Sequence, residues 1–224
     1  MTNTKPTVSD EIWNAFVAAH EAKLNATSAL VGDPESFAAI SGNSPDRSPE
    51  PFGSLSDVDD EVDRALATLH SATATPLPHP DHPATQLAKE SGQQLHQIVT
   101  DTDEDIHQEI SKLKDAKSLD DAAWIASMKE KEKKSGDRLL AANHAFYQKI
   151  MDRGLAHPDE RPFLMKIADG FSAVVAAVVN FVKKAAEWLV QKLEWIWNKI
   201  KDGAAWIWDK IKTAANAVAH FFGL

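Results

Sequence analysis

The sequence contains no cysteine, which excludes disulfides, thiolate zinc sites, iron–sulfur clusters and cysteine nucleophiles. It also lacks GxGxxG, GxxxxGK[ST] and GxSxG motifs, so it gives no support for a phosphate-binding loop or a nucleophile elbow. The first residues, MTNTKPTVSDEIWNAF, have no basic stretch followed by an apolar run, so no signal peptide is predicted and a cytoplasmic location is expected. We therefore expect a protein that is not an enzyme, with no catalytic residues and no cofactor.

Metal-binding patterns are equally scarce. His79 and His82 occur in a proline-rich stretch, and His96 and His107 fall on one helix face with Asp103. Structural zinc usually requires four ligands of fixed geometry, and the chain has no HExxH motif or other pair of histidines four residues apart. The sequence therefore predicts no metal site.

Charge is distributed unevenly along the chain. The formal net charge is −9, but residues 181–224 hold seven Lys and four Asp or Glu, a net charge of +3, and the rest of the chain carries −12. Nucleic-acid phosphate would be repelled by most of this surface, so nucleic acid is not an expected partner. An anionic membrane would attract the basic C-terminal region, by about 1 kcal/mol for each well-placed Lys.

What the sequence does contain is apolar residues at steps of three and four, which predict an all-α fold, a bundle of long amphipathic helices. Residues 1–31 are expected to form an N-terminal helix capped by Ser9, and residues 54–157 an acidic helical bundle. Gly154 is the expected C-cap of the last helix in that bundle. The predicted helices span Ser9–Val31, Ser54–Ala74, Ala84–Lys117 and Ser118–Arg153, with the last two antiparallel.

Two stretches rich in proline separate these helices. Residues 32–53 are dominated by Pro, Gly, Ser and acidic side chains, which bury too little apolar surface to offset the entropy of ordering. Residues 75–83 contain four prolines, each of which removes an amide donor and favours extended backbone before it. The first stretch is predicted to be a flexible, disordered linker and the second a stiff one.

Residues 158–224 form an apolar and amphipathic C-terminal region. No proline follows Phe163, so this region is expected to form one helix or two, with Gly170 and Gly203 as the weak points. The apolar run Phe171–Val182 is interpreted as helix because its neighbours on both sides are strongly helical. It has about a dozen apolar residues, fewer than the roughly 20 that a spanning helix needs.

The most informative feature is an amphipathic pattern in this region, rich in Trp and Lys. On a helical wheel, aliphatic side chains form one stripe, Trp side chains line both of its margins, and Lys side chains flank the Trp. A membrane interface favours this order, because indoles prefer the headgroup boundary and Lys extends outward on an apolar stem. The candidate binding residues are Trp188, Trp195, Trp197, Trp206, Trp208, Ile196, Ile200, Ile207, Ile211, Lys192, Lys199 and Lys210.

Part of this pattern is repeated. The sequence WIWNKIK at residues 195–201 recurs as WIWDKIK at residues 206–212, an offset of eleven residues. Eleven residues complete three helical turns almost without drift, so both copies would present the same face. The unit resembles the lipid-binding repeats of exchangeable apolipoproteins, from which it departs in having two copies and many Trp.

The Trp- and Lys-rich amphipathic pattern is compatible with two functions. The first is a peripheral or partially inserting membrane protein that binds an anionic lipid membrane through its C-terminal amphipathic helix. The second is a soluble interaction or scaffold protein whose Trp stripe binds partner helices or forms a homo-oligomer. The stripe would also suit the inner face of a helix packed on the helices upstream, as in most soluble proteins.

Overall fold

The computed structural model describes residues 8–29, 31, 55–74, 82–115, 121–193 and 203–224. Over these residues the fold is all-α, as predicted, and no strand occurs. Six α-helices and one short 3-10 turn follow one another along the chain. They are α1 (Asp10–Ser28), α3 (Leu55–Thr73), α4 (Pro83–Asp115), α5 (Asp121–Ala156), η1 (Pro158–Glu160), α6 (Arg161–Gln191) and α8 (Gly203–Phe222).

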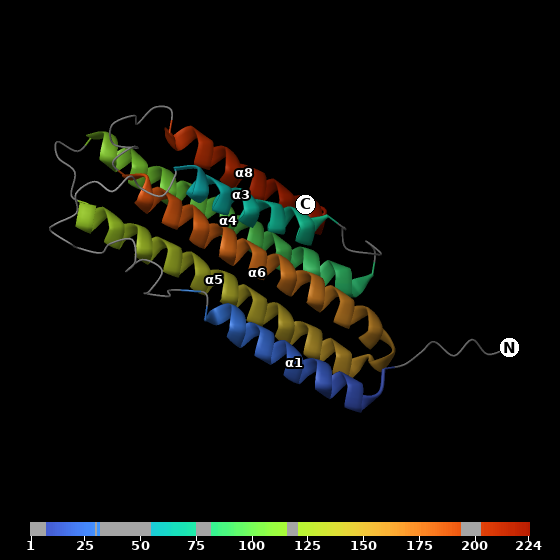
Figure 1. Cartoon of the computed structure of the whole chain (residues 1–224). Helices are drawn as coiled ribbons and strands as arrows, with labels where there is room; N and C mark the ends of the chain where they lie inside the picture. The colour runs from blue at the N-terminus through green and yellow to red at the C-terminus, as the bar shows by residue number, and fades with distance from the viewer. Residues whose placement is uncertain (1–7, 30, 32–54, 75–81, 116–120, 194–202) are drawn as a thin grey trace.

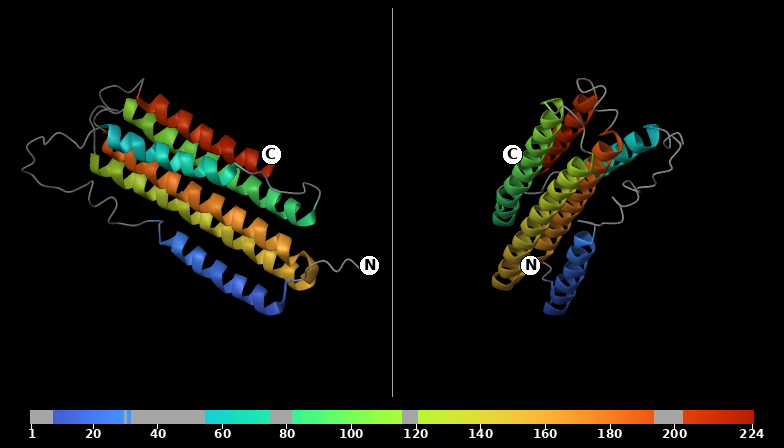
Figure 2. Two further views of the ribbon diagram at one scale, coloured as in Figure 1. Left: turned by 45° about the vertical axis from the view of Figure 1, so that its right-hand side comes forward. Right: turned by 90° about the vertical axis from the view of Figure 1, so that its left-hand side faces the viewer.

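The helices lie roughly side by side in an elongated bundle, with α6 in the interior (Figures 1 and 2). Helix α6 packs against α3 on one side and α5 on the other, and α8 packs on α4 and α3. Helix α1 lies at the opposite edge of the bundle, against α5 and α6. Of the 31 residues in α6, 19 are buried, which makes this helix the central element of the core.

Helices α4 and α5 are antiparallel, as expected. Asp101 pairs with Arg138 at 2.5 Å, and Asp105 pairs with Lys131 at 3.1 Å. The residue number thus increases along α4 as the number of its partner decreases along α5, which is the pattern of antiparallel helices. Both predicted proline-rich linkers, residues 32–53 and 75–83, lie outside the described residues, except that His82 is described and Pro83 begins α4.

The N-terminal helix begins as the sequence predicts. The Ser9 side chain accepts a hydrogen bond from the Ile12 amide at 3.3 Å, which satisfies one of the unpaired donors at the helix start. Gly154, however, is not a C-cap: α5 continues to Ala156. A Cβ at Gly154 would lie 2.2 Å from the Trp13 ring. The glycine is therefore explained by the close approach of α1, and not by the end of α5.

The described part of the C-terminal region contains two α-helices. Helix α6 passes through Gly170 and ends at Gln191, and α8 begins at Gly203, one of the two expected weak points. Because α6 ends at Gln191, the alternative of one continuous amphipathic helix through the C-terminal region to Leu224 is wrong. Helices α6 and α8 run in opposite directions, and α8 is also antiparallel to α4 (Figures 1 and 2).

Among the described residues, one stretch of helix, over Pro158–Gln191, is long and apolar enough to cross a membrane by length and composition, and half of its most apolar window is buried in the bundle. The run Phe171–Val182 alone, with about a dozen apolar residues, is shorter than the roughly 20 that a spanning helix needs. The difference arises because the residues before Phe171, such as Leu164 and Ile167, are also apolar and extend the window. A buried core helix of a soluble protein meets the same criterion, so length and composition alone do not distinguish a membrane-spanning helix from a core helix.

Candidate functional site

A compact group of Trp and Lys side chains lies where α3 covers α6 and α8. We call it the Trp–Lys surface and define it as Lys184 and Trp188 of α6, Lys192 at the C-cap of α6, and Trp206 and Lys210 of α8. Trp188 and Trp206 stack with ring centroids 5.1 Å apart. The Lys192 ammonium lies 5.8 Å from the Trp188 ring, and that of Lys210 lies 5.1 Å from the Trp206 ring, which are cation–π distances.

Helix α3 meets this surface with acidic side chains. The indole N–H of Trp188 donates to Asp59 Oδ1 at 2.7 Å, and the same oxygen lies 3.1 Å from Lys192 Nζ. Farther along α3, Asp63 pairs with Lys210 at 2.6 Å. Asp59 and Asp63 are four residues apart and lie on one helix face, so a single face of α3 reaches both C-terminal helices.

A third acidic residue, Glu61, pairs with Lys184 of α6 at 3.0 Å, and Lys184 also contacts Glu187 of its own helix at 2.8 Å. Burial alone would lower the pKa of Lys184, but hydrogen bonds to Glu187 and Glu61 outweigh it and hold the pKa above its ordinary value. Lys184 is therefore a full cation in the bundle.

These pairs differ in exposure. The side chains of Asp59, Glu61 and Asp63 remain 43%, 45% and 51% exposed, whereas that of Lys192 is 5% exposed. Partly exposed ion pairs contribute about 0–1 kcal/mol each. Lys192 is the exception, because removing one partner of a nearly buried cation takes away part of the interaction energy that offsets its desolvation. The acidic contact of α3 is thus weak at its edges and strongest around Asp59.

Beneath the charges lies an apolar seam. Val62, Leu66 and Leu69 of α3 are buried in the core that includes the α6 side chains. Toward the C-terminal end of α3 the contact opens into a groove of about 650 Å³. Small and polar side chains line it, namely Ala67, Thr68, Ser71, Ala72, Ala173, Ala176, Ala177 and Asn180.

The predicted stripe residues that the structure describes are buried. Trp188, Ile207 and Ile211 are 2%, 0% and 2% exposed, and Trp206 is half-buried. Trp208, also half-buried, stacks on His107 of α4 with a centroid distance of 4.5 Å. The helical periodicity therefore identified the buried face correctly, and the upstream helices α3 and α4 cover it. Trp195, Trp197, Ile196, Ile200 and Lys199 lie outside the described residues.

A second polar cluster, which the sequence did not suggest, joins α1, α5 and α6. His20 Nε2 lies 2.7 Å from Ser172 Oγ, and Ser172 Oγ donates to Asn143 Oδ1 at 3.3 Å. His20 also stacks on Tyr147, with centroids 4.1 Å apart. The single proton of the Ser172 hydroxyl serves only one of these two bonds, so when Ser172 donates to Asn143, His20 Nε2 is the donor to Ser172.

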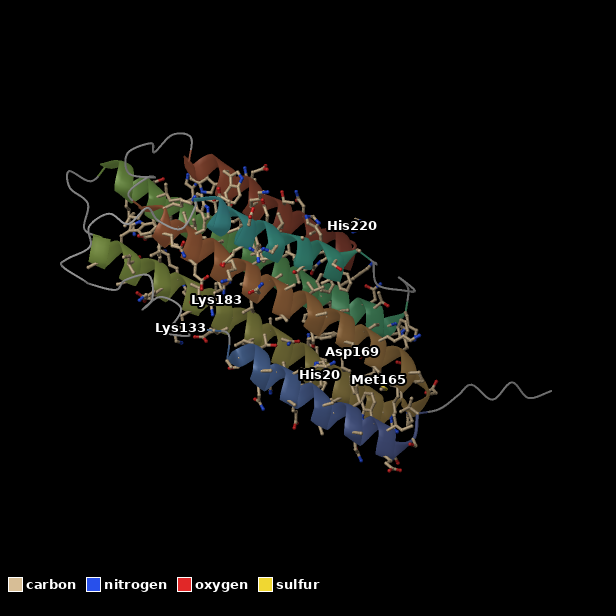
Figure 3. All side chains as sticks on the ribbon, in the orientation of Figure 1. His20, Lys133, Met165, Asp169, Lys183 and His220 are labelled. Carbon is tan, nitrogen blue, oxygen red and sulfur yellow. The ribbon has the colours of Figure 1, made fainter. Side chains whose placement is uncertain are left out.

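This cluster borders a cavity of about 300 Å³, which is also lined by the ion pair of Lys23 with Asp169 (2.7 Å). Figure 3 labels His20 on α1 and Asp169 on α6. Burial, together with the nearby Lys23 ammonium, lowers the pKa of His20 to about 4, although Asp169 opposes this shift. His20 is therefore neutral at pH 7.

Among the residues that the structure describes, no group of three His, Asp or Glu side chains is arranged to hold a metal ion. His79 lies outside them. Comparison of the chain with protein-family models, with curated proteins and with solved structures finds no match.

Proposed function

We propose that the protein acts on membranes as a peripheral, partially inserting protein of the cytoplasm, and that the closed bundle is its membrane-free form. The observation that carries the proposal is the composition of the Trp–Lys surface. An ordinary helical core would be filled with Leu, Ile and Val, whereas here stacked indoles and ammonium groups meet a helix that is acidic at the contact.

The chemistry of these side chains suits an anionic lipid interface. Indole rings favour the headgroup boundary, since the ring is apolar and the N–H needs a partner. Lys side chains reach phosphate from an apolar stem. The adjoining helix α6 supplies the apolar length that partial insertion would require.

Binding in this mode requires a rearrangement, because Trp188 and the aliphatic stripe are covered by α3 and α4 in the bundle. A ligand shifts a conformational equilibrium only by its differential affinity for the two states. A membrane would bind the opened form and not the closed one. The expected behaviour is therefore slow binding that depends on the density of anionic lipid.

The test uses the full chain with vesicles of phosphatidylglycerol or phosphatidylcholine at low ionic strength. Trp188 is already buried, so a blue shift of its emission would be uninformative, and quenching by brominated lipid is the better measurement. Trp13→Phe and Trp124→Phe together leave only the five C-terminal Trp as reporters. We expect flotation and quenching with phosphatidylglycerol. Absence of both, over hours of incubation at low salt, would refute the proposal.

A second candidate is an interaction protein that binds a partner helix or a second copy of itself. The groove between α3 and α6 favours it, because small side chains allow two helix backbones to approach closely. Here light scattering would give a mass above 24.6 kDa for the free protein, and vesicles would leave the Trp emission unchanged. Ala176→Trp, which would fill the groove, would restore the monomer mass.

A further inference from the structure

We propose that α3 is a displaceable acidic cover whose carboxylates occupy the positions that anionic lipid headgroups take when the Trp–Lys surface binds a bilayer. This inference rests on the proposed membrane function and adds to it the covering element and the class of lipid. Its occupant is the surface of a bilayer that carries anionic phosphate headgroups.

The contacts of α3 match those that a phosphate group makes. Asp59 accepts a hydrogen bond from the Trp188 indole and pairs with Lys192, so one oxygen receives both an N–H donor and a cation. A lipid phosphate has the same charge and the same kind of acceptor oxygen, and charged hydrogen bonds to it are of comparable strength. Replacement of one by the other leaves Trp188 and Lys192 satisfied.

The arrangement extends over both C-terminal helices. Glu61 and Asp63 place two further carboxylates against Lys184 of α6 and Lys210 of α8. The three paired ammonium groups and the two stacked indoles would then become one continuous surface once α3 leaves. A single phosphate could satisfy one of these Lys residues, whereas a bilayer satisfies all three together.

Access does not require the core to unfold first. The carboxylates of Asp59, Glu61 and Asp63 are each between 43% and 51% exposed, so a headgroup can approach the edge of every pair from solvent. The apolar seam of α3, through Val62, Leu66 and Leu69, lies beneath these pairs, and the groove lined by Thr68 and Asn180 lies beside the C-terminal part of it. Exchange of the ion pairs can therefore precede separation of the helices.

Departure of α3 also leaves the remaining long helices paired. Helices α4 and α5 keep their contacts at Asp101 with Arg138 and at Asp105 with Lys131, and α5 stays packed on α6. Nine residues connect α3 to α4, and 26 connect it to α1. Nine extended residues reach about 30 Å, enough for α3 to clear the surface while it remains attached.

The first experiment removes the acidic contacts. The variant Asp59→Asn/Glu61→Gln/Asp63→Asn keeps the side-chain shapes, and the matched control Asp60→Asn/Glu104→Gln/Glu130→Gln changes the net charge equally at exposed positions. We expect faster amide hydrogen exchange in α3 and flotation with phosphatidylglycerol vesicles at a lipid concentration lower by at least on the order of tenfold, because two of the pairs are modest and the pair of Asp59 with the nearly buried Lys192 is stronger. Equal behaviour of the variant and its control would overturn the proposal.

The second experiment locks the cover. Thr68→Cys and Asn180→Cys place one thiol on α3 and one on α6 at the same groove, and the chain has no other cysteine. A bismaleimide with a reducible disulfide joins them. The tethered protein should neither float with phosphatidylglycerol nor be quenched by brominated lipid, and addition of reductant should restore both. Flotation of the tethered protein at the wild-type level would overturn the proposal.

The outcomes separate this inference from the proposed function. If the wild-type protein binds vesicles and the tether has no effect, the membrane function stands and the cover does not. If α3 exchanges freely in the acid-to-amide variant and no vesicle binding follows, both fail. If the reduced protein binds and Lys184→Gln/Lys192→Gln/Lys210→Gln abolishes its preference for phosphatidylglycerol, the surface under α3 is the binding surface.

Discussion

Acidification from pH 7.5 to pH 5 should destabilise the bundle through one side chain, His20. Its pKa is about 4 in the folded protein because of burial, against 6.5 in an unfolded chain. The unfolded state therefore takes up the proton first as the pH falls. The stability that neutral His20 contributes is complete above pH 6.5 and is lost progressively between pH 6.5 and pH 4.

The size of the effect follows from the difference of about 2.5 pH units between the two pKa values. Each unit corresponds to about 1.4 kcal/mol, so the full loss below pH 4 is about 3 kcal/mol, and about 2 kcal/mol of it has occurred by pH 5. That is a large fraction of the 5–15 kcal/mol that typical domains possess. Other groups also titrate in this range, and a variant is needed to isolate His20.

His20→Gln supplies that variant, because its amide can still donate to Ser172 and cannot take up a proton near neutral pH. Urea unfolding followed by circular dichroism, at half-unit steps from pH 7.5 to pH 4.5, would give the free energy of unfolding of both proteins. We expect the wild-type value to fall by about 2 kcal/mol more than the variant value by pH 5. Parallel curves would refute the assignment of a lowered pKa to His20.

Gly154→Ala should destabilise the protein by about 1–3 kcal/mol, because the alanine Cβ would lie 2.2 Å from the Trp13 ring, and this clash outweighs the helix propensity of alanine. Faster amide hydrogen exchange in α1 would show that the clash displaces α1. Arg161→Met should cost about 2–3 kcal/mol in thermal unfolding, because the buried guanidinium donates to the carbonyls of Gly154 and Val8. Asp10→Asn should cost under about 1 kcal/mol in the same assay, since Asp10 is 85% exposed and Arg161 keeps its bonds to both carbonyls; equal losses would contradict this ranking. Trp188→Phe should cost about 1–2 kcal/mol and accelerate exchange in α3, and an unchanged urea midpoint would show that its indole N–H contributes nothing.

Local features of the fold were predictable because they depend on neighbours along the chain. The spacing of apolar residues located α1, α3, α4 and α5 to within a few residues, although it did not predict the end of α6 at Gln191. Ser9 was identified as a cap from its position before Asp10 and Glu11. The buried stripe through Ile207 and Ile211 also followed from periodicity alone. Each of these properties is fixed within three or four residues, the range over which helical faces repeat.

The partners of these faces were not predictable, because they come from distant parts of the chain. Asp59 lies 129 residues before Trp188, and His20 lies 152 residues before Ser172. The acidic residues of α3 looked like ordinary dipole-favouring residues at a helix start. The imbalance between an acidic body and a basic C-terminal region is the sequence feature that could have indicated cationic partners for the acidic residues of α3. Gly154 was misread for the same reason, since the ring that occupies its space belongs to α1.

Helix α3 is joined to the chain at both ends, and this has a consequence for what can displace it. A tethered helix returns to its site at an effective concentration on the order of millimolar. Dissolved phosphate, or a soluble phosphorylated compound, would have to exceed that concentration to compete with Asp59, Glu61 and Asp63. A bilayer meets the condition because its headgroups stand side by side. The covalent attachment of α3 would thus make its displacement depend on the local density of anionic groups: dilute soluble anions would not displace it, whereas the closely spaced headgroups of an anionic bilayer would.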